Sequence, residues 1–371
     1  QGKGNLCDLR TAIVHAFGLI FIITIVLNVA AYLFLDPILL FLNVPDQIYA
    51  MMREYVWLIF AGIGATFLYN FFACLLRALG NSSVPLVFLG ISAALNVALD
   101  LLFVLVFNWG VGGAAVATVF SQYVSGIGIA LYTFLRRKDL RPARCNFRFS
   151  SNILREIGSL SLLTCLQQSV MNFGILLVQG LINSFGPVIM AAYAAAVKID
   201  SFAYMPVQDF GNAFSTFIAQ NYGAGKMERI RAGIKKALQL TLLFCVVISA
   251  IVILFAKPLL LLFVQPHETE ILSAGTAYLR IVSAFYFGIG CLFLLYGLYR
   301  AVQRPGMSVA LTVISLGTRV ALAYALSVPM GAIGIWLSIP IGWILADLTG
   351  MIYYIKKKDR ILSDPLKSAE R

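Results

Sequence analysis

The sequence predicts an all-α polytopic membrane protein, and three observations point to this fold class. Hydrophobic residues make up 60% of the 371 residues and charged residues only 12%, whereas soluble domains are nearer half apolar and a quarter charged. Apolar runs of about 20 residues, long enough to cross a bilayer core, recur along the whole chain. The runs are continuous rather than alternating, which favours helices among the structures that satisfy the backbone in lipid.

Ten transmembrane helices follow from these runs, taken in order along the chain. Short loops at 108–110 and 184–187 predict antiparallel hairpins between the helices that flank them. The predicted spans are 11–35, 52–76, 84–107, 111–135, 154–183, 187–217, 231–255, 275–299, 306–328 and 332–355.

The basic residues orient these helices with both ends of the chain in the cytoplasm. Of the 28 Lys and Arg residues, nearly all lie in the segments that this topology places inside. The exceptions are Arg53, Lys198, Lys257, Arg280 and Arg319. The net charge of +12 therefore reflects membrane topology, and we expect no nucleic-acid partner.

An internal repeat relates the two halves of the chain. The opening motif QGKG returns in the stretch QNYGAGK, and identities continue along both halves. The matched pairs are Gly2/Gly223, Gly4/Gly225, Arg10/Arg231, Pro37/Pro258, Tyr55/Tyr278, Arg77/Arg300, Gly110/Gly331 and Tyr132/Tyr353. The second half carries two further helices, 154–217, before its copy of the motif. We therefore expect an intact protein of twelve helices in two parallel six-helix halves, with the first two helices absent here.

The repeat and the charge pattern predict four segments. An N-terminal lobe of four helices, 1–135, is followed by a basic cytoplasmic linker at 136–153. A C-terminal lobe of six helices covers 154–355, and a basic cytoplasmic tail covers 356–371. The linker could bind anionic lipid heads at about 1 kcal/mol per basic residue, but a topology-determining connection between lobes explains it more simply.

Several other classes of function are excluded by the sequence. The six cysteines show no ligand spacing and read as small packing residues. The two histidines, His15 and His267, lie near span ends, and no HExxH or nucleophile motif is present. We therefore expect no enzyme activity, no catalytic residue, no metal site and no cofactor.

Polar side chains inside the spans are the candidates for function, because a charge at a helix centre costs about 2.5–3.5 kcal/mol on insertion scales. Asn96 and Asp100 lie one turn apart on one helix face and offer oxygen ligands for a hard cation. The carboxyl group of Asp100 could instead carry a proton. Asn70 and Thr118 add oxygens from neighbouring helices, although interhelical hydrogen bonding would also explain these residues.

The C-terminal lobe differs in chemistry, because Arg319 stands at the position equivalent to Asn96. Lys198 and Asp200 lie two residues apart and so face different directions. Asp200 and Arg319 are therefore the expected buried pair, which either lines a cavity or only locks two helices together.

Further polar residues lie in the predicted spans of this lobe. Gln167 and Gln168, in the stretch SLLTCLQQSV, are candidates for the cavity wall. Asp209, Asp347 and Arg280 lie nearer predicted span ends, where charged side chains reach the interface at lower cost, and no role is predicted for them.

Several stretches together resemble the multidrug and toxic-compound extrusion (MATE) transporters. They are residues 191–230, LRALGNSSVPL (76–86), LNVALDLLF (95–103) and GVGGAAVATVFSQ (110–122). The resemblance implies two six-helix lobes around a central cavity, in a monomer of the prokaryotic cell membrane. It also implies an antiporter that exports amphipathic, often cationic drugs or toxic metabolites against inward Na⁺ or H⁺.

The same resemblance implies a cation site in the first lobe. Its roles in prokaryotic members fall here on Asn70, Asn96, Asp100 and Thr118, and a further Asp comes from a first helix that this chain lacks. Some Na⁺-coupled relatives also carry a Glu in the helix that corresponds to 154–183, where SLLTCLQQSV offers no acid. A second-lobe cation site of that type is not expected.

Two classes of function remain open. A cation-coupled antiporter is the leading prediction, and a lipid-linked saccharide flippase of the same broad superfamily is the alternative. A flippase for an anionic pyrophosphate lipid would line its cavity with several Arg or Lys, whereas only Lys198 and Arg319 lie in mid-span. The oxygen ligands of the first lobe favour cation coupling.

Overall fold

The computed structural model describes residues 4–41, 46–147 and 149–361, and in these ranges all regular structure is helical. In this part of the chain, nine spans are long and apolar enough to cross a membrane, and a tenth consists of two helices joined at a bend. They cover all ten predicted spans, which confirms the all-α polytopic fold. Gly2 of the predicted repeat and residues 362–371 of the predicted tail lie outside the described residues.

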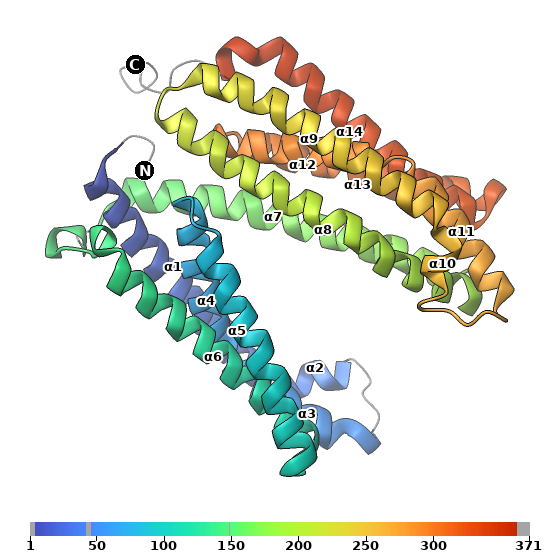
Figure 1. Ribbon diagram of the computed structural model, residues 1–371, viewed down its shortest axis with the longest axis horizontal. Coiled ribbons are helices and arrows are strands. Elements are labelled where there is room, and N and C mark those ends of the chain that lie inside the picture. The colour runs from blue at the N-terminus through green and yellow to red at the C-terminus, as the bar shows by residue number, and fades with distance from the viewer. Residues whose placement is uncertain (1–3, 42–45, 148, 362–371) are drawn as a thin grey trace. The chain divides into compact units, whose positions relative to one another are not determined.

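The chain divides into two compact units, of which the first runs from Lys3 to Ile157 (Figure 1). Its second membrane span consists of two helices, α3 and α4, that meet at Gly62. The elements are α1 (Leu6–Leu33), α2 (Leu35–Phe41), α3 (Asp46–Ala61), α4 (Ile63–Ala78), α5 (Ser83–Asp100), a π-helical segment (Leu101–Val106) and α6 (Gly110–Arg136). Two 3₁₀ turns, Lys138–Leu140 and Arg144–Phe147, follow in the linker.

Helices α4 and α6 approach each other closely at the centre of this unit. A Cβ on Gly126 of α6 would stand 2.8 Å from the carbonyl oxygen of Ala65 on α4, so glycine permits this approach. Phe72 and Leu76 of α4 pack beside it on Ile129 of α6. The contact fixes the positions of the polar side chains that α4 and α6 carry further along.

The linker folds back on α1 of the same unit. Arg10 donates from Nε to the carbonyl oxygen of Asp139 at 2.8 Å, and Asn146 donates to Thr11 Oγ1 at 3.0 Å. Arg137 pairs with Asp139 at 2.8 Å, and this hydrogen bond lowers the pKa of the Asp139 carboxyl. These contacts make the described part of the linker an ordered part of the unit.

The second unit, Gly158–Arg371, packs its helices around α12, most of whose side chains are buried. Its aromatic core includes Trp336, whose ring stacks on Tyr193 with 5.7 Å between centroids. The elements are α7 (Ser151–Asn183, which begins in the first unit), α8 (Pro187–Gly223), α9 (Met227–Leu254), α10 (Ala256–Leu260), α11 (Thr269–Ser283), α12 (Tyr286–Ala301), α13 (Pro305–Met330) and α14 (Ala332–Ile361).

Helices α11 and α12 form one broken span, bent by 51° between Ser283 and Tyr286. After the bend, glycines allow α12 to lie close to its neighbours. A Cβ on Gly297 would stand 2.6 Å from the carbonyl oxygen of Gly211 on α8. The first turn of α12 therefore lies between a bend and a tightly packed helix body.

The internal repeat is visible in the backbone. Residues with φ in the left-handed region, which favours glycine, recur at the offsets predicted from the sequence. The pairs are Gly4/Gly225 (72° and 66°), Gly110/Gly331 (58° and 59°) and Gly80/Gln303 (86° and 59°). The backbone therefore turns in the same way at these corresponding positions of the two halves.

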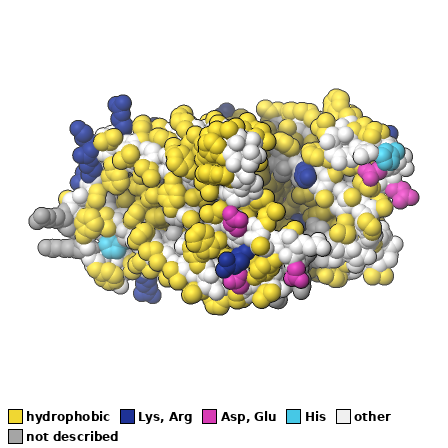
Figure 2. All heavy atoms as spheres, turned by 90° about the horizontal axis from the view of Figure 1, so that it is seen from below, with side chains coloured by type: hydrophobic (Ala, Val, Ile, Leu, Met, Phe, Trp, Pro, Cys, Tyr) yellow, Lys and Arg dark blue, Asp and Glu magenta, His cyan; other side chains and the backbone are white. Residues whose placement is uncertain are grey.

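The surface has the character of a membrane protein. Figure 2 shows hydrophobic side chains over most of the visible face, with Lys, Arg, Asp and Glu in small groups. Helix α1 has no fully buried residue although its composition is strongly apolar. Such a surface is suited to contact with lipid chains rather than water.

Candidate functional site

Asp100 is the last residue of α5 and is half-buried. Its Oδ1 is buried and accepts no hydrogen bond from the residues that the structure describes. The salt bridges among the described residues are Arg53–Asp36 and Arg137–Asp139, so none of these residues forms a salt bridge with Asp100. An unpaired carboxylate oxygen in an apolar span is costly unless a cation or a proton neutralises it.

Asn96, one turn before Asp100 on α5, is joined to α6. Its Nδ2 donates to Thr118 Oγ1 at 3.3 Å, and that hydroxyl donates in turn to the carbonyl oxygen of Ala114 at 3.0 Å. The amide nitrogen is therefore held toward α6, and none of the described residues donates to Asn96 Oδ1. The end of α5 thus offers two oxygens, from Asn96 and Asp100, as ligands of the kind that hard cations prefer.

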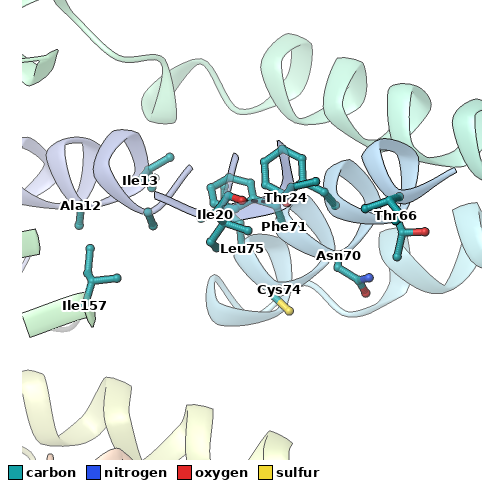
Figure 3. Close-up of a pocket in the computed structure, with 13 residues that line it drawn as sticks. Ala12, Ile13, Ile20, Thr24, Thr66, Asn70, Phe71, Cys74, Leu75 and Ile157 are labelled. Atoms are coloured by element: carbon teal, nitrogen blue, oxygen red, sulfur yellow. Dashed lines mark hydrogen bonds between the residues drawn. The ribbon is translucent and has the colours of Figure 1, made fainter. Parts of the chain in front are cut away.

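Asn70 on α4 occupies a different place. It is exposed on the wall of a cavity of about 640 Å³ between α1 and α4, where Thr66 also lies (Figure 3). Within the described part of the chain, no hydrogen bond joins Asn70 to Asn96, Asp100 or Thr118. Of the four predicted ligands, Asn96 and Thr118 are therefore joined by a hydrogen bond, and Asp100 lies on the same helix as Asn96. Asn70 faces the cavity instead.

A second polar contact joins α4 and α6 and was not predicted from the sequence. Thr66, one turn before Asn70, donates to Gln122 Oε1 at 3.4 Å, and Gln122 lies one turn after Thr118. A Cβ on Gly62 would stand 2.6 Å from this oxygen, so glycine leaves room for the glutamine. The sequence did contain a signal for this contact. Thr66 and Asn70, like Thr118 and Gln122, are four residues apart, and this spacing places both members of a pair on one helix face.

Asp200 on α8 lies in a buried group of tyrosines in the second unit. Its Oδ2 accepts a hydrogen bond from the hydroxyl of Tyr278 at 3.3 Å. The hydroxyl of Tyr286 also lies beside this carboxylate, but no hydrogen bond of normal geometry joins the two. Among the described residues, Asp200 Oδ1 and the Tyr286 hydroxyl are buried without a hydrogen-bond partner. This is a second polar site within the helices.

The direct ion pair predicted between Asp200 and Arg319 is not formed in this structure. Arg319 makes no salt bridge in the described ranges, and its Nε is buried without a partner. It acts on Asp200 only at longer range. The physical reason is that Tyr278 occupies one carboxylate oxygen, while the Arg319 side chain leaves α13 beside Gly342 of α14.

The other predicted cavity residues do not gather around Asp200. Lys198 is exposed, and its Nζ lies 5.6 Å from the centre of the Phe263 ring in a cation–π contact. Gln167 is buried and Gln168 is exposed, so the two glutamines face different sides of α7. The assignment of Lys198, Gln167 and Gln168 to the substrate cavity therefore stays a prediction.

Two aspartates given no role from the sequence differ sharply. Asp209 is exposed on α8. Asp347 is buried, with 8% exposure, in the interior of α14, which corrects its predicted place near a span end. No group of three or more His, Cys, Asp or Glu side chains able to hold a metal ion occurs among the described residues.

Comparison with known proteins gives a consistent result. The chain matches the family model MatE over residues 1–102 and 161–325. It is 28% identical over 330 residues to "Probable multidrug resistance protein YpnP" of Bacillus subtilis, covering 88% of this chain and 73% of that protein. It is 24% identical over 368 residues to "Probable multidrug resistance protein NorM" of Thermotoga maritima, covering 96% and 78%.

The solved structures agree with the fold. A MATE protein crystallised in complex with MaL6 superposes with a TM-score of 0.91 at 21% sequence identity. The superposition covers 97% of this chain and 81% of that one. At this level of identity the likeness establishes the arrangement of helices.

Proposed function

Because the chain belongs to the MatE family of multi-pass membrane transporters, we propose that it is a cation-coupled efflux antiporter. In this proposal it exports amphipathic, often cationic drugs or toxic metabolites by alternating access, driven by inward movement of Na⁺ or H⁺. It acts as a monomer in the cell membrane, and both ends of the chain face the cytoplasm, as the distribution of Lys and Arg favours.

The observation that carries the proposal is the unpaired oxygen of Asp100 beside the Asn96–Thr118 hydrogen bond. A cation at this position would accept electron density from Asp100 Oδ1 and Asn96 Oδ1, and a proton would bind Asp100 alone. Either event removes an uncompensated charge from an apolar span. Asn70, which faces the cavity, is assigned in this proposal to the substrate path rather than to the ion.

The cavity between α1 and α4 supports the proposed substrate class. Its volume of about 640 Å³ lies within the usual range for drug-sized ligands, about 300–1,000 Å³. Phe67 and Phe71 contribute aromatic surface, whereas Thr66 and Asn70 contribute the polar groups. An amphipathic molecule would place its apolar body on the rings and its polar end beside the amide.

The flippase alternative is supported less well. An anionic pyrophosphate lipid needs several cationic side chains together in the membrane interior. Lys198 is exposed on the Phe263 ring, which leaves Arg319, a half-buried residue whose Nε is buried, as the cation that acts on Asp200. We propose that Asp200 serves the substrate path, with Arg319 as a counter-charge at longer range.

The test is ion-driven movement of a fluorescent amphipathic cation in lipid vesicles that contain the purified protein. A Na⁺ gradient and a pH gradient are imposed separately at zero membrane potential, with protein-free vesicles as the control. Dye movement against its own gradient under one ion supports the antiporter and identifies the ion. Dye equilibration at the same rate with and without either ion gradient would overturn cation coupling. Movement of a pyrophosphate-linked lipid in place of the dye would favour the flippase.

A further inference from the structure

A buried carboxyl group lies in the second unit, apart from both sites described above. Asp347, in the interior of α14, is 8% exposed, and its Oδ1 has no hydrogen-bond partner among the described residues. Its Oδ2 faces α12, 3.7 Å from the position that a Cβ of Gly288 would take. The N–H of Gly288 already donates to the carbonyl oxygen of Phe285 at 2.8 Å. Helix α12 therefore leaves space for the carboxyl group but gives it no donor.

Among the described residues, two titratable side chains of α12 interact electrostatically with Asp347. They are the thiol of Cys291 and the phenol of Tyr296. Helices α11 and α13 also pack on α14. Among the described residues, no Lys, Arg or His from these helices or from α14 itself acts on the carboxyl group. Trp343, one turn earlier on α14, packs on the same glycine.

We propose that Asp347 is a proton-binding site of the C-terminal lobe, separate from Asp100. A carboxylate removed from water without a partner is so unfavourable that the group takes up a proton instead. A hard metal cation would need roughly six oxygen ligands, whereas the side chains of Gly288, Cys291 and Trp343 offer none and Tyr296 offers one phenol oxygen. The surroundings therefore select a proton over a metal cation.

In this proposal the proton is released when the first turns of α12 move relative to Asp347 and the surroundings of its carboxyl group change. Gly288 and Cys291 lie in the first two turns of α12, directly after the 51° bend. Tyr286, in the same first turn, interacts electrostatically with Asp200. A change in the bend would therefore alter the surroundings of both carboxyl groups. That the proton contributes to transport rests on the proposed function, whereas its binding does not.

Trp343 provides the readout, because its Cβ lies 3.4 Å from the same Gly288 Cβ position that Asp347 faces. The purified protein in lipid vesicles is titrated from acid to alkaline pH while tryptophan fluorescence is recorded. Trp343→Phe identifies the share of the signal that belongs to Trp343. We expect a pH-dependent step in this share that disappears in Asp347→Asn. The matched control Asp209→Asn, which changes an exposed aspartate of the same lobe, should keep the step.

Infrared difference spectra of the wild-type protein add a readout that does not require the variant to fold. With ¹³C-labelled aspartate, we expect the wild-type spectra to show a protonated-carboxyl band that is lost as the pH rises. Where Asp347→Asn folds, this band should be missing from its spectra. A fluorescence step that survives unchanged in Asp347→Asn would overturn the proposal. So would the absence of any protonated aspartate band across the titration.

Dye transport in the same vesicles separates this inference from the proposed function. If the Trp343 step depends on Asp347 but the wild-type protein moves no dye, the proton site stands and the antiporter fails. If ions drive dye movement but the Trp343 step ignores Asp347→Asn, the antiporter stands and the proton site fails.

Discussion

Asn96 on α5 donates its amide Nδ2 to Thr118 Oγ1 on α6 at 3.3 Å. The contact joins two neighbouring spans and also orients the amide, because the nitrogen is used and Oδ1 is left without a protein donor. Asp100 follows one turn later with an oxygen that is likewise unpaired among the described residues. In the proposed ion site, this hydrogen bond therefore orients a ligand, in addition to its effect on helix packing.

Removal of this hydrogen bond should show non-additive losses of stability. We expect a coupling energy of about 0.5–1.7 kcal/mol between Asn96→Ala and Thr118→Val, the usual range for hydrogen bonds between membrane helices. The free energy of unfolding in micelles gives the double-mutant cycle. Thr24→Val is the control, because Thr24 bonds only within α1, to the carbonyl oxygen of Ile20. Additive losses for Asn96 and Thr118 would show that the contact is not formed.

Tyr278 should stabilise the second unit through Asp200. Tyr278→Phe leaves Asp200 Oδ2 without its donor, and an unsatisfied buried acceptor typically costs about 1–3 kcal/mol. The loss should be smaller in an Asp200→Asn background, where the acceptor is uncharged. Tyr193→Phe is the matched control, since that ring stacks on Trp336 in the same core. Equal losses of unfolding free energy for Tyr278→Phe in both backgrounds would argue against the pairing.

Two glycines should respond oppositely to the same substitution. Gly80 has φ of 86°, so Gly80→Ala should lower the free energy of unfolding by about 1–2 kcal/mol. Gly90 lies inside α5 with open space around its Cβ position, so Gly90→Ala should raise it by about 0.5–1 kcal/mol. Thermal unfolding in micelles compares the two variants. A change of the unfolding temperature in the same direction for both variants would contradict the left-handed turn at Gly80.

The contact between α2 and α3 should weaken in acid. Hydrogen bonding from Arg53 lowers the pKa of Asp36, and the pair lies 2.6 Å apart. Because the folded pKa is below the unfolded value, the contribution is complete above roughly pH 4 and is lost as the pH falls through the folded pKa. Both side chains are about half exposed, so salt should reduce the effect further.

Hydrogen exchange of the α2 amides measures this contribution. The wild-type protein should be better protected than Asp36→Asn at neutral pH, and the difference should disappear in acid. A difference that persists unchanged across the pH range would show that the ionised Asp36–Arg53 pair is not its source.

The spans and the repeat were predictable because each depends on properties that a linear sequence displays. A helix must be apolar for about 20 residues to cross the bilayer, and all ten such runs are helical. The repeat rested on identities such as Gly4/Gly225, and both residues of this pair share a left-handed φ. Glycine at such a turn is a local requirement and can be recognised without tertiary contacts.

The positions of individual side chains were less predictable. In a helix that is apolar almost all round, periodicity does not show which face meets which neighbour. Asn70 therefore faces a cavity instead of Asn96, Lys198 is exposed on Phe263, and Asp347 is buried. The bend between α11 and α12 contains no proline, so the local sequence did not predict it.

The central claim is that Asp100 carries the coupling ion, and ion-driven dye movement in vesicles tests it most directly. Asp100→Asn keeps the shape of the side chain but removes its charge, and Asp209→Asn makes the same change at an exposed position. We predict that the effective ion gradient still drives dye against its gradient in wild-type and Asp209→Asn vesicles. Asp100→Asn vesicles should show only the movement seen without a gradient. Wild-type ion-driven movement in Asp100→Asn would contradict the account.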